Sequence, residues 1–332
     1  MAETPVRPAV TGRVVVGVDL GGTKIAAATV GADGGWGTVH TTPTPASAGP
    51  DAVLDAVATL VRTVTADAAA CPSTVLGAVG IGTAGVVDVV GGTIVSATDT
   101  FPHWRGTDVA GGVGDRLTVR GTAPVPVFVE NDVDAHAAGE SWRGAAAGAR
   151  SALLVAVGTG VGGAVVLDGR PLRGAHHLAG ELGHMPVPGA EGLLCPCGRT
   201  GHLEAVAAGP AIHRRYLALG GDPAAKDARD VVARAQRDDG LADRAVRESA
   251  TALGRAIAGV VTVLDPEIVV VGGGVAGSGD AWWSALDRSL RAEVVDVLAG
   301  LPVRRAALGG AAAIVGSARG AWDLLDRTER TV

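Results

Sequence analysis

Two glycine-rich turns, each placed between two apolar runs, constrain this sequence more than any other feature. The first lies within RVVVGVDLGGTKIAAATV, residues 13–30, and the second within SALLVAVGTGVGGAVVL, residues 151–167. An apolar run, a glycine break and a second apolar run are typical of a β-hairpin. A P-loop or a dinucleotide fingerprint would instead need the glycines to open a helix. The sequence therefore predicts two hairpins, one early and one central.

Alternating helical and strand patterns follow each hairpin. Residues 50–70 and 241–264 have helical apolar spacing, whereas residues 75–88 and 267–280 contain buried strands that run into glycines. This order predicts an α/β fold of two lobes with mixed, largely parallel sheets, and the cleft between the lobes is the expected binding site. An apolar content of 47% in 332 residues is enough to fill two cores.

Charge and hydropathy exclude several classes of partner. The net charge is −6 and the arginines are spread along the chain, so we expect no nucleic-acid partner and no binding to an anionic membrane. No uninterrupted apolar run reaches the ~18 residues of a membrane span. Residues 1–12, which we expect to be disordered, lack the apolar core of a signal peptide. Three cysteines do not make a disulfide framework. We therefore expect a cytoplasmic protein.

The first glycine turn, within DLGGTK, could hold phosphate. Gly21, Gly22 and Thr23 would point backbone N–H groups and a hydroxyl into one concavity. Asp19 could hold Mg²⁺, directly or through water. An ordinary β-turn is the alternative, and for Gly-Gly alone it is the better interpretation. The second turn, GTGVGG from Gly158, favours phosphate, because two such turns facing each other could grip a polyphosphate group from both sides.

A carboxylate and an amide stand where a strand passes into an alanine-rich helix, in VFVENDVDAHAAGE, residues 127–140. Asp132 could accept the proton of a sugar hydroxyl as the hydroxyl attacks phosphorus, while Asn131 could bind a neighbouring hydroxyl. Alternatively, Asp132 is merely the N-cap of the helix. This stretch alone leaves both interpretations open.

The segment GELGHMPVPGAEGLLCPCGRTGHLEAV, residues 180–206, gathers side chains that bind metals. Two thiolates and two imidazoles are the donors of a closed tetrahedral Zn²⁺ site, although the spacing is not that of a zinc finger and chance is the alternative. Glu181 and Glu204 are harder ligands, and we expect them to bind hydroxyls instead. A capping or solvated helix residue is the alternative for Glu204. The candidate zinc ligands are His184, Cys195, Cys197 and His202.

The whole set of motifs resembles the ROK family of repressors and sugar kinases, within the actin, hexokinase and Hsp70-like ATPase superfamily. The resemblance implies two actin-like (ribonuclease H-like) α/β lobes, with a helix around residues 311–327 that returns to the first lobe. We expect a small N-terminal lobe, residues 13–129 with 311–332, and a large C-terminal lobe, residues 130–310, with the zinc-binding loop. The motifs, from residue 17 to about 316, are DLGGTK, GIGTAGVVD, ENDVDAHAAGE, VGTGVGG, GELGHMPV, CPCGRTGHLEAVAAG and VVVGGGV.

The resemblance implies an ATP-dependent hexose kinase that uses ATP, Mg²⁺ and a structural Zn²⁺, with Asp132 as the catalytic base. His184 is then both a zinc ligand and a neighbour of the sugar, and His202 stands where the family usually has cysteine. The implied sugar-binding residues are Asn131, Asp132, Glu181, His184 and Glu204. The implied ATP-binding residues are Asp19, Gly21, Gly22, Thr23, Lys24, Gly158, Thr159 and Gly160, with Gly272, Gly273 and Gly274 at the adenosine.

Several alternatives stay open beside glucose, the leading substrate. N-acetylmannosamine or N-acetylglucosamine is the alternative sugar, because Thr98–Asp99 stands where many glucose-acting members have an asparagine-containing segment. Polyphosphate is a lesser alternative donor, since no added basic stripe would hold a polymer. A non-catalytic sugar sensor is the alternative from another class. We expect no DNA-binding role, because about a dozen residues precede the first strand, whereas a winged-helix domain needs about 80. The resemblance also implies a homodimer.

Overall fold

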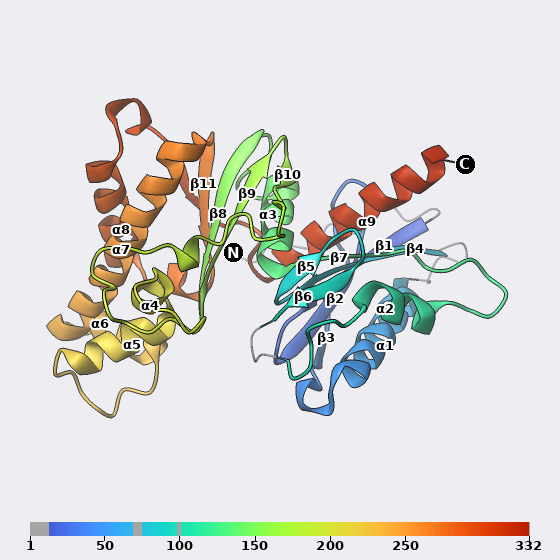
Figure 1. Cartoon of the computed structure of the whole chain (residues 1–332), viewed down its shortest axis with the longest axis horizontal. Coiled ribbons are helices and arrows are strands. Elements are labelled where there is room, and N and C mark those ends of the chain that lie inside the picture. The colour runs from blue at the N-terminus through green and yellow to red at the C-terminus, as the bar shows by residue number, and fades with distance from the viewer. Residues whose placement is uncertain (1–12, 69–74, 98–100, 332) are drawn as a thin grey trace. The chain divides into compact units, whose positions relative to one another are not determined.

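The computed structural model describes residues 13–68, 75–97 and 101–331 (Figure 1). The segment expected to be disordered, residues 1–12, and the Thr98–Asp99 position lie outside the described residues. The chain divides into two compact units. The first comprises residues 1–148, 169–178 and 307–332, and the second comprises residues 149–168 and 179–306.

The first unit is built on a mixed sheet with strand order β3-β2-β1-β4-β7. Strands β1 and β2 form the predicted antiparallel hairpin, while β1, β4 and β7 run parallel, so their carboxyl ends meet at one edge. The elements are β1 (Arg13–Leu20), β2 (Lys24–Val30), β3 (His40–Pro43), α1 (Pro50–Ala68), β4 (Val75–Thr83), β5 (Val86–Asp88), β6 (Thr93–Ser96), α2 (Val109–Leu117), β7 (Val127–Asn131), α3 (Asp132–Arg143), β10 (Arg170–Pro171) and α9 (Ala312–Thr331).

Strand alternation divides the first unit's apolar side chains between two cores. On β1, Val16 and Val18 belong to the core shared with α1 and α2, whereas Val15 belongs to the core shared with α9. Successive side chains of a strand point to opposite faces, so an unbroken valine run can fill both. Helix α9 lies on one face of this sheet and helices α1 and α2 lie on the other (Figure 1).

Glycines allow α9 to approach its neighbours closely. A Cβ atom at Gly80, on β4, would lie 1.9 Å from the backbone oxygen of Ser317, and a Cβ atom at Gly316 would lie 1.8 Å from the backbone oxygen of Ala135 on α3. No side chain fits at either position without moving a backbone. The contact with α3 also explains where the first unit ends. We predicted a boundary after residue 129, but α3 packs against α9, so the first unit continues to residue 148 and is not the smaller of the two.

The second unit is built on a mixed sheet in which β9, β8, β11 and β12 follow one another. The central hairpin predicted from the sequence pairs β8 with β9 antiparallel, and β8, β11 and β12 run parallel. The elements are β8 (Ser151–Val157), β9 (Val161–Leu167), α4 (Glu204–Ala207), α5 (Gly209–Ala218), α6 (Ala228–Ala235), α7 (Gly240–Leu264), β11 (Ile268–Gly272), α8 (Asp280–Glu293) and β12 (Val303–Arg305).

Helix α7 supplies much of the second unit's core and runs beside α8 (Figure 1). It begins where the Asp239 side chain accepts hydrogen bonds from Leu241 N and Ala242 N, and it ends at Asp265 in the left-handed conformation. Leu253 and Ile257, on its buried face, are fully shielded from solvent. Among the helices that the structure describes, none combines the length and the apolar character needed to cross a bilayer. The predicted mixed α/β fold is confirmed.

Candidate active site

In the first unit, the predicted polar residues lie at the carboxyl edge of the sheet. Asp19 pairs in register with Gly82 on β4, and Thr83 pairs with Asn131 on β7. Asp19, the following glycine turn and the start of α3 are therefore on the same edge. In parallel α/β sheets this edge is where ligands bind.

Hydrogen bonds hold the first glycine turn in shape. Gly21 N donates to Lys24 O at 3.1 Å, and the Thr44 hydroxyl donates to Gly21 O at 2.7 Å. Thr44 N also donates to Thr23 O at 3.1 Å. The residue that follows β3 therefore holds the backbone of this turn through two hydrogen bonds.

At the junction between β7 and α3, the residue that caps the helix is Asn131 and not Asp132. Asn131 is the N-cap of α3, because its Oδ1 accepts from Val133 N at 2.8 Å and from Asp134 N at 3.2 Å. The alternative in which Asp132 caps the helix is therefore wrong, since Asp132 is the first helical residue. Asn131 Nδ2 donates to Gly85 O at 2.9 Å, and an amide nitrogen carries a second hydrogen for a ligand.

Charges gather around Asp19. Burial raises the pKa of the Asp19 carboxyl above its usual value, His136 opposes this rise, Asp132 adds to it, and Lys24 opposes it. These four groups therefore interact at the same edge of the sheet. A divalent cation would favour the ionised form of such a carboxylate. Asp19 is thus suited to the predicted Mg²⁺ role.

Sequence reasoning did not single out His136. Its ring Nδ1 lies 2.8 Å from the backbone oxygen of Asp132, one helical turn earlier. The i, i+4 spacing on α3 is the signal that could have placed this ring beside Asp132.

In the second unit, the other two predicted glycine segments share one sheet edge. The turn Gly158–Gly160 follows β8, and Gly272 ends β11, which pairs in parallel with β8 through Gly272 and Ala156. Gly273 has a φ of +88°, and a Cβ atom there would lie 2.3 Å from Val157 O, so this close approach requires glycine.

Glu204 connects the glycine turn to the cysteine loop. It is the first residue of α4, its Oε2 accepts from Val161 N at 2.8 Å, and its Oε1 lies 4.0 Å from Cys195 Sγ. The side chain is half-buried. Glu204 is therefore held by the hairpin, rather than being a solvated helix residue.

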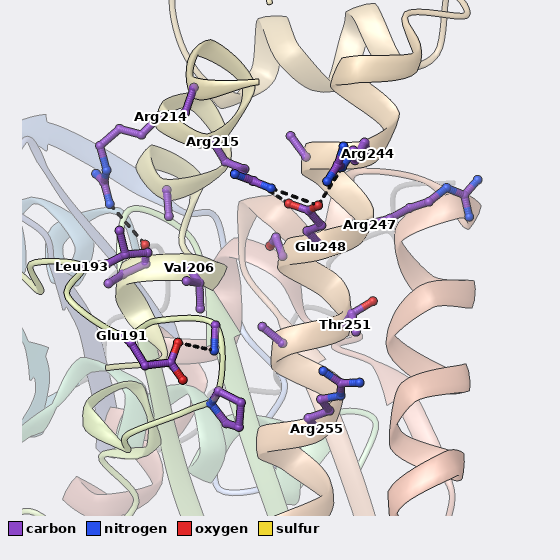
Figure 2. Close-up of a pocket in the computed structure, with 18 of the residues that line it drawn as sticks. Glu191, Leu193, Val206, Arg214, Arg215, Arg244, Arg247, Glu248, Thr251 and Arg255 are labelled. Atoms are coloured by element: carbon purple, nitrogen blue, oxygen red, sulfur yellow. Dashed lines mark hydrogen bonds and ion pairs between the residues drawn. The ribbon is translucent and has the colours of Figure 1, made fainter. Parts of the chain in front are cut away.

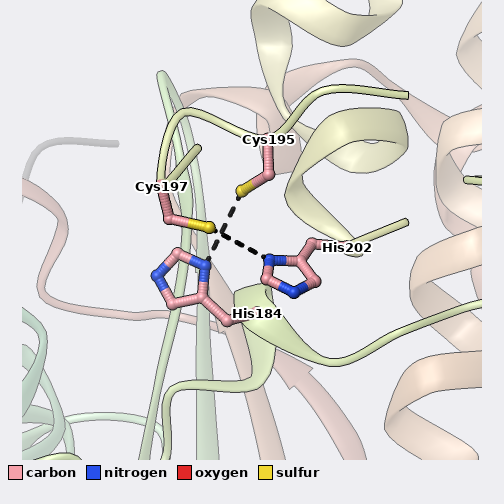
Figure 3. A group of neighbouring side chains, drawn as sticks. All are labelled: His184, Cys195, Cys197 and His202. Atoms are coloured by element: carbon pink, nitrogen blue, oxygen red, sulfur yellow. Dashed lines mark hydrogen bonds between the residues drawn. The ribbon is translucent and has the colours of Figure 1, made fainter. Parts of the chain in front are cut away.

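The four predicted metal ligands come together in the second unit (Figure 3). His184 Nδ1 lies 3.7 Å from Cys195 Sγ, and His202 Nδ1 lies 3.2 Å from Cys197 Sγ. One ligand atom from each of the four residues lies within 4.8 Å of the others. The grouping comes from two chain reversals, since Leu203 N donates to Met185 O and Cys195 N donates to Arg199 O. The structure therefore brings all four predicted ligands together in a group that could hold a metal ion.

The donor set suits zinc. Tetrahedral Zn²⁺ with bonds of about 2.0–2.3 Å requires its donors to be roughly 3.3–3.8 Å apart, which the two measured pairs approach. Burial is the main cause that raises the pKa of the Cys195 thiol to about 11. A bound cation would be needed to keep this thiol deprotonated at neutral pH.

His184 faces two groups through different ring nitrogens. Its Nδ1 is directed to Cys195, while its Nε2 lies 3.9 Å from Glu181 Oε2. The two roles that the resemblance implied for this residue are therefore compatible, because zinc binding at Nδ1 leaves Nε2 on the side of Glu181. Glu181 immediately precedes the short 3₁₀ turn Leu182–His184.

A separate pocket of about 990 Å³ lies elsewhere on the second unit, between the loop at Glu191, helix α5 and helix α7 (Figure 2). Arg215 and Arg244 both pair with Glu248 inside it, at 2.5 and 2.9 Å. The residues described as lining this pocket include none of the predicted catalytic, nucleotide or metal residues. We therefore do not assign the active site to this pocket, although it is large.

Comparisons with known proteins identify the family. The mixed sheets with glycine-turn hairpins define an α/β protein of the actin-like ATPase class. The chain belongs to the ROK family, because the sequence model of this family matches residues 15–323. Glucokinase from Thermotoga maritima is 34% identical over 297 residues, 86% of this chain and 88% of that protein. N-acetylmannosamine kinase from Escherichia coli is 34% identical over 301 residues, 89% and 96% of the two chains.

Solved structures of ROK proteins have the same fold as this chain. A ROK hexokinase from Thermus thermophilus has a TM-score of 0.82 and 35% identity, covering 95% of this chain and 99% of its own. A ROK family glucokinase from Streptomyces griseus, solved with glucose and AMPPNP, has a TM-score of 0.76 and 30% identity, covering 93% and 99%.

Proposed function

We propose that this protein is an ATP-dependent hexose kinase with Asp132 as its general base. The observation that carries the assignment is the position of Asp132. It is the first residue of α3, at the sheet edge that also holds Asp19 and the first glycine turn. A glucokinase that binds glucose and an ATP analogue shares the fold over most of both chains, and this supports the substrate class.

In the proposed reaction, the Asp132 carboxylate accepts the proton of a sugar hydroxyl. The hydroxyl oxygen forms a bond to the γ-phosphorus of ATP, and the bond from this phosphorus to the β–γ bridging oxygen breaks, which leaves ADP and a sugar 6-phosphate. The second amide hydrogen of Asn131 would hold a neighbouring sugar hydroxyl. Glu181, His184 and Glu204 would bind further hydroxyls.

The nucleotide is assigned to the glycine segments and to Asp19. The turns Gly21–Lys24 and Gly158–Gly160 would bind the phosphates through backbone N–H groups, and Gly272–Gly274 would lie against the adenosine. Mg²⁺, when bound, neutralises charge on the triphosphate, and Asp19 would hold it directly or through water.

Three further assignments go with the kinase. Zinc at His184, Cys195, Cys197 and His202 would be structural, because four protein ligands leave no open coordination position. It would lock the loop that carries the sugar-binding glutamates. We also propose a homodimer that acts in the cytoplasm, to be tested by light scattering coupled to size-exclusion chromatography and by cell fractionation.

The test is ADP release with Mg-ATP across glucose, mannose, fructose, N-acetylglucosamine and N-acetylmannosamine. We expect glucose to give the strongest response. Asp132→Asn keeps the size and polarity of the side chain but removes the base, so turnover should fall about 100-fold or more while sugar binding, measured by calorimetry, persists. Near-normal turnover in this variant would remove Asp132 from the role of base.

The same sugar panel separates the alternatives. The identity to N-acetylmannosamine kinase is similar to that for glucokinase, so an N-acetylhexosamine is the alternative substrate. Polyphosphate offered in place of ATP tests the donor. Tight sugar binding without ADP release from folded protein would favour a non-catalytic sensor.

A further inference from the structure

A buried ion-pair cluster encloses the junction that carries Asp132. Arg173 Nη2 donates to Glu130 Oε2 at 2.5 Å, and Arg173 Nη1 donates to Asp134 Oδ2 at 2.5 Å. Glu130 lies near the end of β7 and Asp134 lies in the first turn of α3, so the two carboxylates flank Asn131 and Asp132 along the chain. One guanidinium therefore joins the end of the strand to the start of the helix.

A contribution to folding stability alone does not account for these buried charges. The Glu130 side chain is 1% exposed, and its Oε1 has no hydrogen-bond partner among the described residues. The Asp134 side chain is 13% exposed. Removing such charges from water is costly, and an apolar cluster of similar volume is often as stable as a buried ion pair. Charged groups that are buried beside a catalytic position are instead candidates for a functional role.

The path of the chain adds a second observation. Arg173 lies in the segment 169–178, which belongs to the first unit, although the chain on both sides of it belongs to the second. The chain then continues to Glu181 and His184, the proposed sugar-binding residues. Through Glu130, Arg173 attaches this segment to the junction that carries the proposed base.

We propose that Arg173 is a positioning residue for phosphoryl transfer, because its two contacts fix the backbone on both sides of Asp132. The proposal rests on the proposed function, in which Asp132 accepts the hydroxyl proton. A guanidinium is a planar fork that can bind two carboxylates at once, whereas a lysine ammonium is a single point charge. Misplacement of a catalytic group by about 1 Å is enough to slow a reaction roughly 100-fold.

The first experiment compares Arg173→Lys with Arg170→Lys. Arg170 lies in the same segment and pairs with Asp323 at 3.2 Å, but its side chain is 62% exposed, which makes it a matched control. We expect Arg173→Lys to lower kcat at least about 10-fold, with the KM for ATP changed by less than about threefold. Arg170→Lys should keep wild-type kinetics. A purely structural role would lower the melting temperature without this split between kcat and KM.

Glu130→Gln gives an independent readout through pH and serves also if Arg173→Lys does not fold. Burial raises the pKa of Glu130 to about 7; Arg173 opposes this rise, while Asp134 and Asp323 add to it. As pH falls through this value, the wild-type carboxyl gains a proton and comes to resemble glutamine. The ratio of wild-type to Glu130→Gln kcat should therefore exceed one at about pH 8 and approach one below about pH 6.

The outcomes separate the two proposals. Loss of turnover in Asp132→Asn together with a reduced kcat in Arg173→Lys, or a pH-dependent ratio for Glu130→Gln, supports the positioning role. If Asp132→Asn is inactive but the folded Arg173 and Glu130 variants keep wild-type kcat at every pH, only the positioning role fails. If Asp132→Asn retains its turnover, the base assignment fails and the positioning role fails with it.

Discussion

Glu140 offers the sharpest test of how the first unit holds together. This carboxylate is 1% exposed and accepts three backbone hydrogen bonds, from Ala145 N at 2.7 Å, Ala307 N at 3.0 Å and Leu308 N at 2.8 Å. It therefore joins the end of α3 to the segment that leads into α9. Residues that lie far apart in the sequence depend on one side chain for their hydrogen bonds.

The magnitude follows from those bonds. A hydrogen bond to a charged group contributes about 1.5–3 kcal/mol, and Glu140→Ala would remove the carboxylate that accepts from three backbone N–H groups, two at half-buried residues and one at an exposed residue. Three such bonds sum to about 4.5–9 kcal/mol. Because water can reach residues that are not fully buried, we expect a loss near the lower end, about 4–6 kcal/mol, a large part of the ~5–15 kcal/mol typical of a folded protein. Glu140→Gln keeps one oxygen but turns an N–H towards a backbone donor, so about 2 kcal/mol should be lost.

The assay is urea denaturation followed by circular dichroism, with Glu267→Ala as the control. Glu267 accepts one hydrogen bond, from Arg150 N at 3.1 Å, at an exposed position, and its loss should cost less than about 1 kcal/mol. We therefore expect the unfolding free energy to decrease in the order Glu267→Ala, Glu140→Gln, Glu140→Ala. A cost below about 1 kcal/mol for Glu140→Ala would refute the argument that this carboxylate organises the segment.

Two further predictions concern the metal and pH. His202→Ala should lose most of its zinc, measured by mass spectrometry on purified protein. His202→Cys should keep about one zinc per chain, and so should the control His176→Ala, which changes an exposed histidine. If His202→Ala binds as much zinc as the wild type, His202 is not a zinc ligand. For Glu130, the folded-state pKa of about 7 exceeds the usual 4.5, so the folded state binds the proton more tightly. The unfolding free energy of the wild type, relative to Glu130→Gln, should therefore fall by at most about 3 kcal/mol as pH rises from about 4.5 to 7, in urea titrations; a rise would contradict the burial argument.

Local patterns in the sequence predicted the turns and strand ends that carry the candidate site residues. The glycine turn after Asp19 and the strand that ends before Asp132 are both visible as apolar runs with polar ends. The cysteine loop was recognisable because Cys195 and Cys197 belong to the few cysteines in the chain.

Pairings across the sequence were not predictable in this way. Arg173 meets Glu130 from 43 residues away, and Glu140 meets Leu308 from 168 residues away. Neither glutamate differs from a surface glutamate in its sequence neighbourhood. Each is buried by contacts that form only in the folded chain, with Arg173 for Glu130 and with the segment before α9 for Glu140. The boundary of the first unit was misplaced for the same reason, since the predicted lobes were divided at a strand end rather than at a packing contact.

The order Glu130-Asn131-Asp132 gives each residue a separate task at one junction. Glu130 turns inward to Arg173, Asn131 satisfies the first helical N–H groups, and Asp132 is therefore not needed as a cap. The Asp132 Oδ1 accepts a hydrogen bond from Val133 N at 2.9 Å, so Oδ2 is the carboxylate oxygen that would take the proton. Because Asn131 caps the helix, one oxygen of the proposed base bonds only its neighbouring N–H, and the other would be turned to the substrate.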